Sequence, residues 1–216
     1  MTTIQTFQVS RTAHVYESGM SSDDPSFLWI VAHGYGQTAQ RIIKKFDVLD
    51  HKHRVVAPEG LNKFYWHDEK RTPSATWMTS HHRLDEIHDY CRYLDQVLAH
   101  YTEGASCKVI LFGFSQGATT LYRWLHASRM EIHAFVNWAG WIPDDLDLSE
   151  MSDILPESNH HFIYGDEDQF LSQERIDKLS RLFQDAMIVP TVHTFAGKHH
   201  IPRTELSRLA PFFIGN

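Results

Sequence analysis

Residues 113–117 read Gly-Phe-Ser-Gln-Gly and directly follow the apolar run at residues 107–112. A helical pattern follows at residues 116–128. A strand that turns sharply into a helix exposes a serine hydroxyl at the end of the strand. Glycine is needed on both sides of that serine, because a Cβ there would collide with the neighbouring strand or helix. The motif and its context therefore predict that Ser115 is a nucleophile rather than an ordinary loop serine.

Strand-like and helix-like segments alternate along the chain. The expected strands are one or two edge strands within residues 6–16, then residues 27–32, 54–58, 107–112, 134–138, 161–164 and 189–195. The expected helices are residues 38–50, 82–101, 116–128, 172–186 and 203–214. This alternation predicts an α/β fold, in which helices cover both faces of a mostly parallel central sheet. We expect one domain spanning residues 1–216.

Two long stretches interrupt this alternation. Residues 59–81 lack a regular pattern, and so does the stretch between residues 138 and 159, which contains an acidic run. Both follow strands, so we expect two modest loop insertions that wall a substrate pocket, with their aromatic residues facing it. The candidate substrate-binding residues are Trp66, Trp77 and Trp141. Small cores that pin the loops would also explain these tryptophans, and the acidic run fits a solvated face better than a specificity element.

The ends of the predicted strands carry residues suited to acyl transfer. In parallel sheets, ligands bind beyond the carboxyl ends of the strands, and the segments there are residues 33–37, Ser115, residues 165–168 and residues 196–200. A serine hydroxyl needs a base, a histidine titrates near neutrality, and a carboxylate fixes the histidine tautomer. Backbone N–H groups in a glycine loop stabilise the oxyanion. The chain order serine, aspartate, histidine therefore predicts a catalytic triad.

These motifs resemble those of the α/β-hydrolase carboxylesterases in the phospholipase/carboxylesterase group, which includes acyl-protein thioesterases. The resemblance rests on residues 33–36, 113–117, 165–168 and 197–202, and it covers the chain from about residue 26 to the end. It implies an α/β-hydrolase fold and a serine esterase without a cofactor. The expected reaction is hydrolysis of esters or thioesters of small to medium acyl groups through an acyl-enzyme on Ser115.

The same resemblance assigns roles by motif match. The triad would be Ser115, Asp168 and His199, and the oxyanion hole would be the backbone N–H groups of Tyr35 and Gln116. Two assignments have alternatives nearby in the sequence. The pattern Gly-x-x-Asp favours Asp168 over Asp166, and Gly-x-His-x-Ile-Pro favours His199 over His200.

Composition narrows the classes of partner. A net charge of −7 without a basic block argues against nucleic acid. Two cysteines do not make a disulfide framework, and the sixteen histidines lack a His-Glu-x-x-His spacing, so no metal is expected. Without a signal-peptide pattern or an apolar run of about 20 residues, we expect a cytoplasmic protein that does not insert into membranes. We expect a small ester or thioester substrate, and the last helix could support a homodimer.

Two other hypotheses stay open. One is a catalytically idle hydrolase-fold protein that binds a ligand, because a fold does not guarantee a function. The other is a lactonase, peptidase or acyltransferase that uses the same triad. The intact set of serine, aspartate and histidine argues against the first, and the modest size of both insertions argues against a peptidase.

Overall fold

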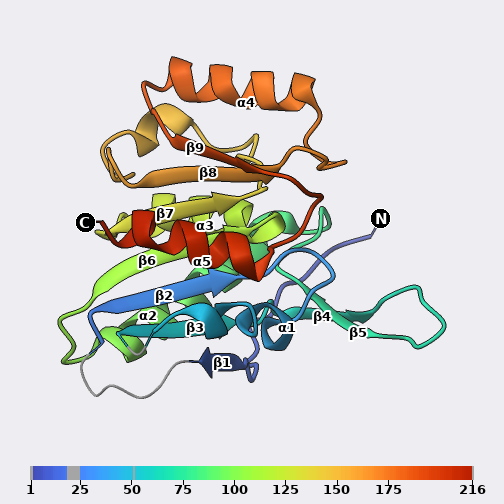
Figure 1. The fold of residues 1–216 in the computed structure, drawn as a ribbon. Helices are drawn as coiled ribbons and strands as arrows, with labels where there is room; N and C mark the ends of the chain where they lie inside the picture. The colour runs from blue at the N-terminus through green and yellow to red at the C-terminus, as the bar shows by residue number, and fades with distance from the viewer. Residues whose placement is uncertain (1, 19–24, 51, 216) are drawn as a thin grey trace.

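The computed structural model describes residues 2–18, 25–50 and 52–215 (Figure 1). Its centre is a seven-stranded sheet in the order β1-β3-β2-β6-β7-β8-β9, in which only the β1–β3 pair is antiparallel. The strands are β1 (Val15–Ser18), β2 (Phe27–Ala32), β3 (His53–Pro58), β6 (Lys108–Phe114), β7 (Ala134–Trp138), β8 (His160–Gly165) and β9 (Thr191–Phe195). The prediction of a mostly parallel central sheet is confirmed.

Helices cover both faces of the sheet, as predicted. In Figure 1, α5 and α1 lie in front of the sheet, and α2 and α3 lie behind it. The helices are α1 (Ala39–Ile43), α2 (Arg83–Thr102), α3 (Gln116–Ser128), α4 (Gln173–Asp185) and α5 (Arg203–Ile214), with short 3-10 helices η1 (Phe46–Val48) and η2 (Leu148–Met151). Four of the five expected helices are confirmed within one residue of their predicted bounds, and the fifth, at residues 38–50, differs from its prediction.

The register of the parallel strands gathers their carboxyl ends at one edge of the sheet. Ala32 at the end of β2 lies opposite Gly113 of β6, and Phe114 lies opposite Trp138 at the end of β7. The central strands are buried on both faces, which explains their continuous apolar sequence. The loops that leave these strands therefore meet above a rigid base.

The predicted edge strands within residues 6–16 are mostly wrong, because β1 begins only at Val15. Its antiparallel partner β3 ends at Pro58, which lies opposite Val15. One more bond joins the Glu59 N–H to the His14 carbonyl at 3.0 Å, and residues 6–14 then run outside the sheet.

The predicted helix at residues 38–50 is broken into α1 and η1. Phe46 lies between Trp29 and Phe112, with ring centroids 5.9 and 4.9 Å away. Burial of this ring decides the local backbone, because helical propensity in so short a segment is a weaker force than tertiary packing.

Residues 59–81 are not irregular, contrary to expectation. They contain a hairpin of β4 (Asn62–Tyr65) and β5 (Pro73–Thr76), which projects from the body of the molecule in Figure 1. Its turn is closed by a bond from the Trp66 N–H to the Thr72 carbonyl at 2.9 Å. Strands of four residues give too short an alternation to be predicted reliably from the sequence.

Candidate active site

Ser115 lies in the sharp turn between β6 and α3. Its φ of 53° and ψ of −119° are strained for a residue with a side chain. The Ser115 N–H donates to the Trp138 carbonyl at 2.8 Å, which ties the turn to β7. A Cβ on Gly117 would lie 2.1 Å from the Ala32 carbonyl oxygen, so only glycine allows α3 to pass this close to β2. The backbone thus holds Ser115 in the conformation that the motif predicts.

Asp168 and His199 follow β8 and β9 and meet at the same edge of the sheet. The His199 Nδ1–H donates to Asp168 Oδ2 at 2.6 Å. The Asp168 side chain is fully buried, and its other oxygen accepts from the Phe170 N–H at 2.8 Å. This pairing fixes the proton on Nδ1 and leaves Nε2 of His199 as the basic nitrogen.

The two alternative residues make other contacts: Asp166 joins the loop after β8 to the loop after β9, and His200 makes a contact within its own turn. Asp166 Oδ1 accepts from the Gly197 N–H at 2.9 Å, and His200 Nδ1 lies 3.0 Å from the Lys198 carbonyl. The structure therefore brings together Asp168 and His199, and it does not bring Asp166 or His200 into that pair.

Two phenylalanine rings contact the His199 ring. The ring centroid of Phe114 lies 4.9 Å from that of His199, and Phe170 lies at 4.7 Å in an edge-on arrangement. Sequence reasoning missed both residues. Their signal is position alone, since Phe114 precedes Ser115 and Phe170 follows the acid by two residues.

The loop after β2 lies against the nucleophile. A Cβ on Gly34 would lie 3.3 Å from the Ser115 Cβ. Within the described part of the chain, the N–H groups of Tyr35 and Gln116 have no hydrogen-bond acceptor. Two unpaired N–H groups beside a serine are the arrangement that an oxyanion hole requires.

The β4–β5 hairpin braces this loop. The Gly36 N–H donates to the Ala75 carbonyl at 3.0 Å, and the Ala75 N–H donates to the Gln37 carbonyl at 2.9 Å. The Gln116 side chain joins the same hairpin, because its Oε1 accepts from the Thr76 hydroxyl at 2.9 Å. Backbone pairing and one amide therefore fix the loop relative to α3.

His33 supports the loop from inside the protein. The Gly60 N–H donates to His33 Nε2 at 2.9 Å, and the His33 Nδ1–H donates to the Gly34 carbonyl at 2.8 Å. Burial lowers the pKa of His33 to about 4, although the bond to Gly34 and the charge of Glu59 act to raise it. The ring is therefore neutral at pH 7, as this pair of bonds requires.

Trp77 stands behind this loop and not at its surface. It is 1% exposed, its Nε1–H donates to the His33 carbonyl at 2.8 Å, and its ring stacks on that of His33. The expectation that Trp77 contacts substrate is therefore corrected, because a buried indole with a satisfied N–H serves as support.

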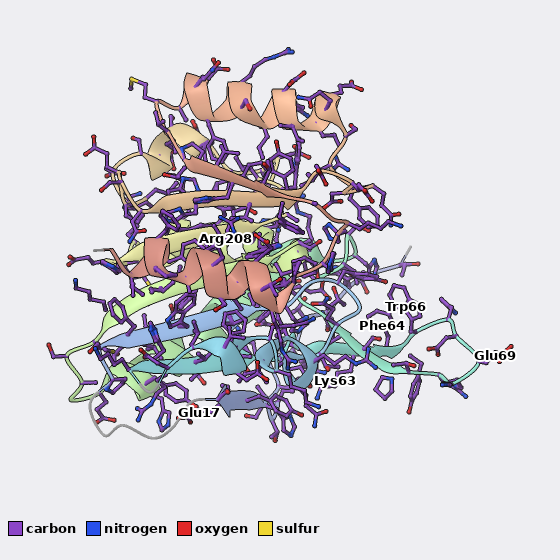
Figure 2. The ribbon with its side chains drawn as sticks, viewed as in Figure 1. Glu17, Lys63, Phe64, Trp66, Glu69 and Arg208 are labelled. Carbon is purple, nitrogen blue, oxygen red and sulfur yellow. The ribbon has the colours of Figure 1, made fainter. Side chains whose placement is uncertain are left out.

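Trp66 lies at the surface, next to the loop after β2 (residues 33–37). It is 45% exposed, and its ring centroid lies 5.9 Å from Tyr35 and 6.1 Å from Phe64. Figure 2 shows Phe64 and Trp66 together on the projecting hairpin. Exposed aromatic clusters of this kind are typical of binding surfaces.

The acidic residues after β7 are exposed, as expected for a solvated face, and Asp145 among them also contacts two helices. Asp145 forms ion pairs with Arg83 of α2 and Arg123 of α3, each at 2.6 Å. Burial acts to raise the pKa of Asp145, but the hydrogen bonds and charge of Arg123 lower it overall. These ion pairs therefore tie the loop that carries Trp141 to the start of α2 and the middle of α3.

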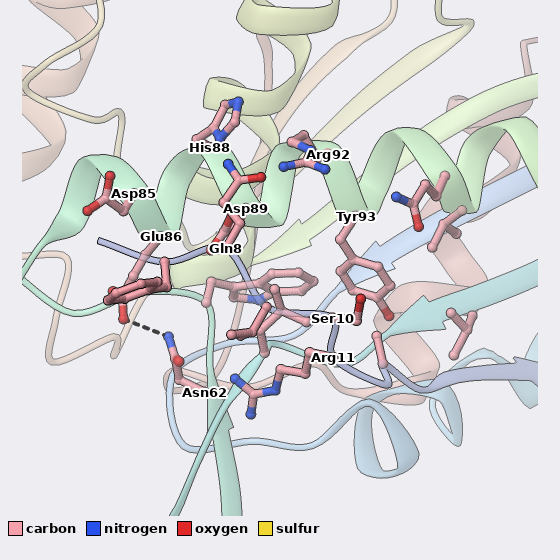
Figure 3. A pocket seen from close by; sticks show the side chains of 18 of the residues that line it. Gln8, Ser10, Arg11, Asn62, Asp85, Glu86, His88, Asp89, Arg92 and Tyr93 are labelled. Atoms are coloured by element: carbon pink, nitrogen blue, oxygen red, sulfur yellow. Dashed lines mark hydrogen bonds between the residues drawn. The ribbon is translucent and has the colours of Figure 1, made fainter. Parts of the chain in front are cut away.

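A cavity of about 920 Å³ lies away from this constellation, between residues 6–15 and α2 (Figure 3). Asn62 and Glu86, which both line it, are joined by a hydrogen bond of 2.9 Å. Ser115, Asp168 and His199 do not line it.

Across residues 2–18, 25–50 and 52–215, no helix is long and apolar enough to cross a bilayer, and no three acidic, histidine or cysteine side chains gather as a metal site.

Solved structures share this fold at low sequence identity. Esterase PE8 is 18% identical, with 93% of this chain and 98% of that chain covered and a TM-score of 0.68. Acyl-protein thioesterase 2 from Zea mays is 12% identical, with 94% and 100% covered and a TM-score of 0.66. A phospholipase/carboxylesterase from Dyadobacter fermentans is 16% identical, with 94% and 96% covered and a TM-score of 0.61. These structures confirm the α/β-hydrolase fold.

The sequence itself decides the family. A search of curated proteins finds no match. Residues 29–209, which include Ser115, Asp168 and His199, match the family described as serine hydrolase (FSH1). The predicted resemblance to serine hydrolases of the α/β-hydrolase type is therefore confirmed, and the chain belongs to the serine hydrolase (FSH1) family.

Proposed function

We propose that this protein hydrolyses carboxylic esters or thioesters of small to medium acyl groups through an acyl-enzyme on Ser115. The observation that carries the proposal is the 2.6 Å bond between His199 and the buried Asp168, at the sheet edge where the strained turn presents Ser115. A binding protein would have no use for a buried carboxylate that fixes a histidine tautomer beside a strained serine.

In the proposed mechanism, the Ser115 hydroxyl attacks the acyl carbon while Nε2 of His199 accepts its proton. Asp168 stabilises the imidazolium that forms and holds the ring in place. The N–H groups of Tyr35 and Gln116 donate to the oxyanion, and one such donor is typically worth about 10²–10³ in rate. His199 then gives its proton to the departing alcohol or thiol. Water, activated by the same nitrogen, releases the acid and restores Ser115.

The surroundings support an apolar acyl or alcohol group. On the oxyanion side, the exposed rings of Tyr35 and Trp66, which meet edge to face, offer apolar surface. The half-exposed ring of Phe170 beside His199, and Trp141 on the loop after β7, offer further apolar surface. We assign substrate contact to Trp66 and Trp141, which lie in the two insertions expected to wall the pocket.

Initial rates on p-nitrophenyl esters from acetyl to palmitoyl, with Ser115→Ala alongside, test the proposal. We expect turnover that falls with chain length and drops about a thousandfold or more in the variant, because the nucleophile is lost. The same measurement on a matching series of thioesters tests whether the protein also hydrolyses thioesters. Turnover that Ser115→Ala retains, or no serine-dependent turnover at any chain length, would contradict the proposal.

A further inference from the structure

Arg175 occupies an unusual place for a cation, in the first turn of α4. The N-terminal end of a helix carries partial positive charge, which disfavours a cation there. The side chain nevertheless makes two defined contacts. Its Nη1–H donates to the Phe170 carbonyl at 3.0 Å, and its guanidinium carbon lies 4.8 Å from the centroid of the Trp141 ring.

The first contact reaches the acid and the base. Phe170 donates its own N–H to Asp168 Oδ1 at 2.8 Å and places its ring 4.7 Å from His199. Phe170 is 52% exposed, so packing within the core does not hold it. The bond from Arg175 to its carbonyl therefore restrains a residue that touches both members of the acid–base pair.

The second contact reaches the nucleophile side. The Trp141 carbonyl accepts from the Thr119 hydroxyl at 2.7 Å. Thr119 lies in the first turn of α3, the helix that begins directly after Ser115. The ion pairs of Asp145 pin the same loop to α3. Trp141 is thus anchored to the element that carries the nucleophile.

We propose that Arg175 is a positioning residue, which clamps the loop bearing Asp168 and Phe170 to the loop bearing Trp141 and so keeps His199 aligned with Ser115. The inference rests on the proposed function. Arginine suits the role because its planar guanidinium stacks on an indole and donates in its own plane at the same time. Lysine reproduces only part of this, since an ammonium is a point charge.

Steady-state kinetics on p-nitrophenyl butyrate separate a clamp from a substrate contact. Arg175→Met should lower kcat about tenfold or more while KM stays within about twofold, because small misplacements of catalytic groups cost rate and not ground-state binding. Arg175→Lys should recover part of the loss. Arg181→Met removes a cation from an exposed site later on α4 and should match wild type. Unchanged kcat in Arg175→Met, or a rise in KM with kcat kept, would overturn the inference.

A double-mutant cycle with Trp141→Leu keeps the test informative if one variant is unstable. If the clamp acts through the indole, Arg175→Met should cost much less in the Trp141→Leu background than in wild type. Equal costs in both backgrounds would contradict the clamp. Ser115→Ala run in parallel keeps the two ideas apart, because serine-independent turnover defeats the proposed function whatever Arg175 does.

Discussion

The nucleophile side of the site and its acid–base side are held by different parts of the chain. On the nucleophile side, backbone bonds between residues 36–37 and Ala75 and the close passage of Gly117 past β2 fix the geometry. On the acid–base side, side chains do this, through the Asp168–His199 bond and the contacts of Phe170. The nucleophile side is therefore sensitive to any atom added to its backbone, such as a Cβ on Gly117. The acid–base side is sensitive to the loss of side-chain atoms that make its contacts.

The difference follows from position in the sheet. β2 and β6 are central and buried, so the loops that leave them are short and closely packed. β8 and β9 lie toward one end of the sheet, where β9 is an edge strand, and side-chain contacts join the loops that follow them. Substitutions on the two sides should fail in different ways.

The largest effect is expected from Gly117→Ala. The new Cβ would lie 2.1 Å from the Ala32 carbonyl oxygen, so β2 and α3 must move apart. We expect a loss of about 3 kcal/mol in the free energy of unfolding, as for a severe overpacking change, together with loss of activity. Urea denaturation measures it.

Gly104→Ala is the control for Gly117→Ala. A Cβ on Gly104 meets nothing within 4 Å, although its φ is +69°. We expect only about 1 kcal/mol of destabilisation from the left-handed backbone. Equal losses in the two variants would show that close packing does not build the nucleophile side.

Acid should weaken the nucleophile side through His33. Its pKa is lowered from 6.5 to about 4, so between these values the unfolded chain binds a proton that the folded chain does not. Stability is therefore fully present above pH 6.5 and falls as the pH drops toward 4. His33→Gln should reduce this slope by about one proton, measured from unfolding free energies at pH 7 to 4.5.

His160→Gln sharpens the result. Burial lowers the pKa of His160 to about 3, and its Nε2 lies 2.8 Å from the Tyr122 hydroxyl, away from the loop at residues 33–37. His160→Gln should also reduce the slope of the unfolding free energy against pH. Only His33→Gln should in addition lower kcat at pH 7. If both variants change kcat equally, the loop contact of His33 has no special role.

The smallest effect is expected from Gln116→Ala. The change removes the side-chain bonds to residues 76–78 but keeps the backbone N–H proposed for the oxyanion hole. Because the backbone bonds at Ala75 remain, we expect kcat to fall by less than about tenfold, below the loss for a missing oxyanion donor. If Gln116→Ala lowers kcat more than Arg175→Met does, side-chain contacts matter more on the nucleophile side than on the acid–base side, which would contradict the comparison.

Much of this site could be predicted from the sequence because its signals are local. A Gly-x-Ser-x-Gly motif after a buried strand is legible without a structure, and so is the order of the later aspartate and histidine motifs. The hairpin at residues 62–76 could not be predicted, since its strands are short and its bonds to residues 36–37 join residues far apart in the sequence. The burial of Trp77 was equally hidden, because composition does not say which face of a loop an indole takes.

The sequence by itself determined the alternating fold, the strained serine turn and the residue types at the strand ends, because backbone sterics and hydrophobic periodicity act over a few neighbouring residues. Only the tertiary structure decided that Asp168 pairs with His199, while Asp166 accepts from the Gly197 N–H and His200 contacts the Lys198 carbonyl. It also placed Arg175 between Phe170 and Trp141. Those choices depend on distances between segments about 30 residues apart, which the packing of the whole sheet sets.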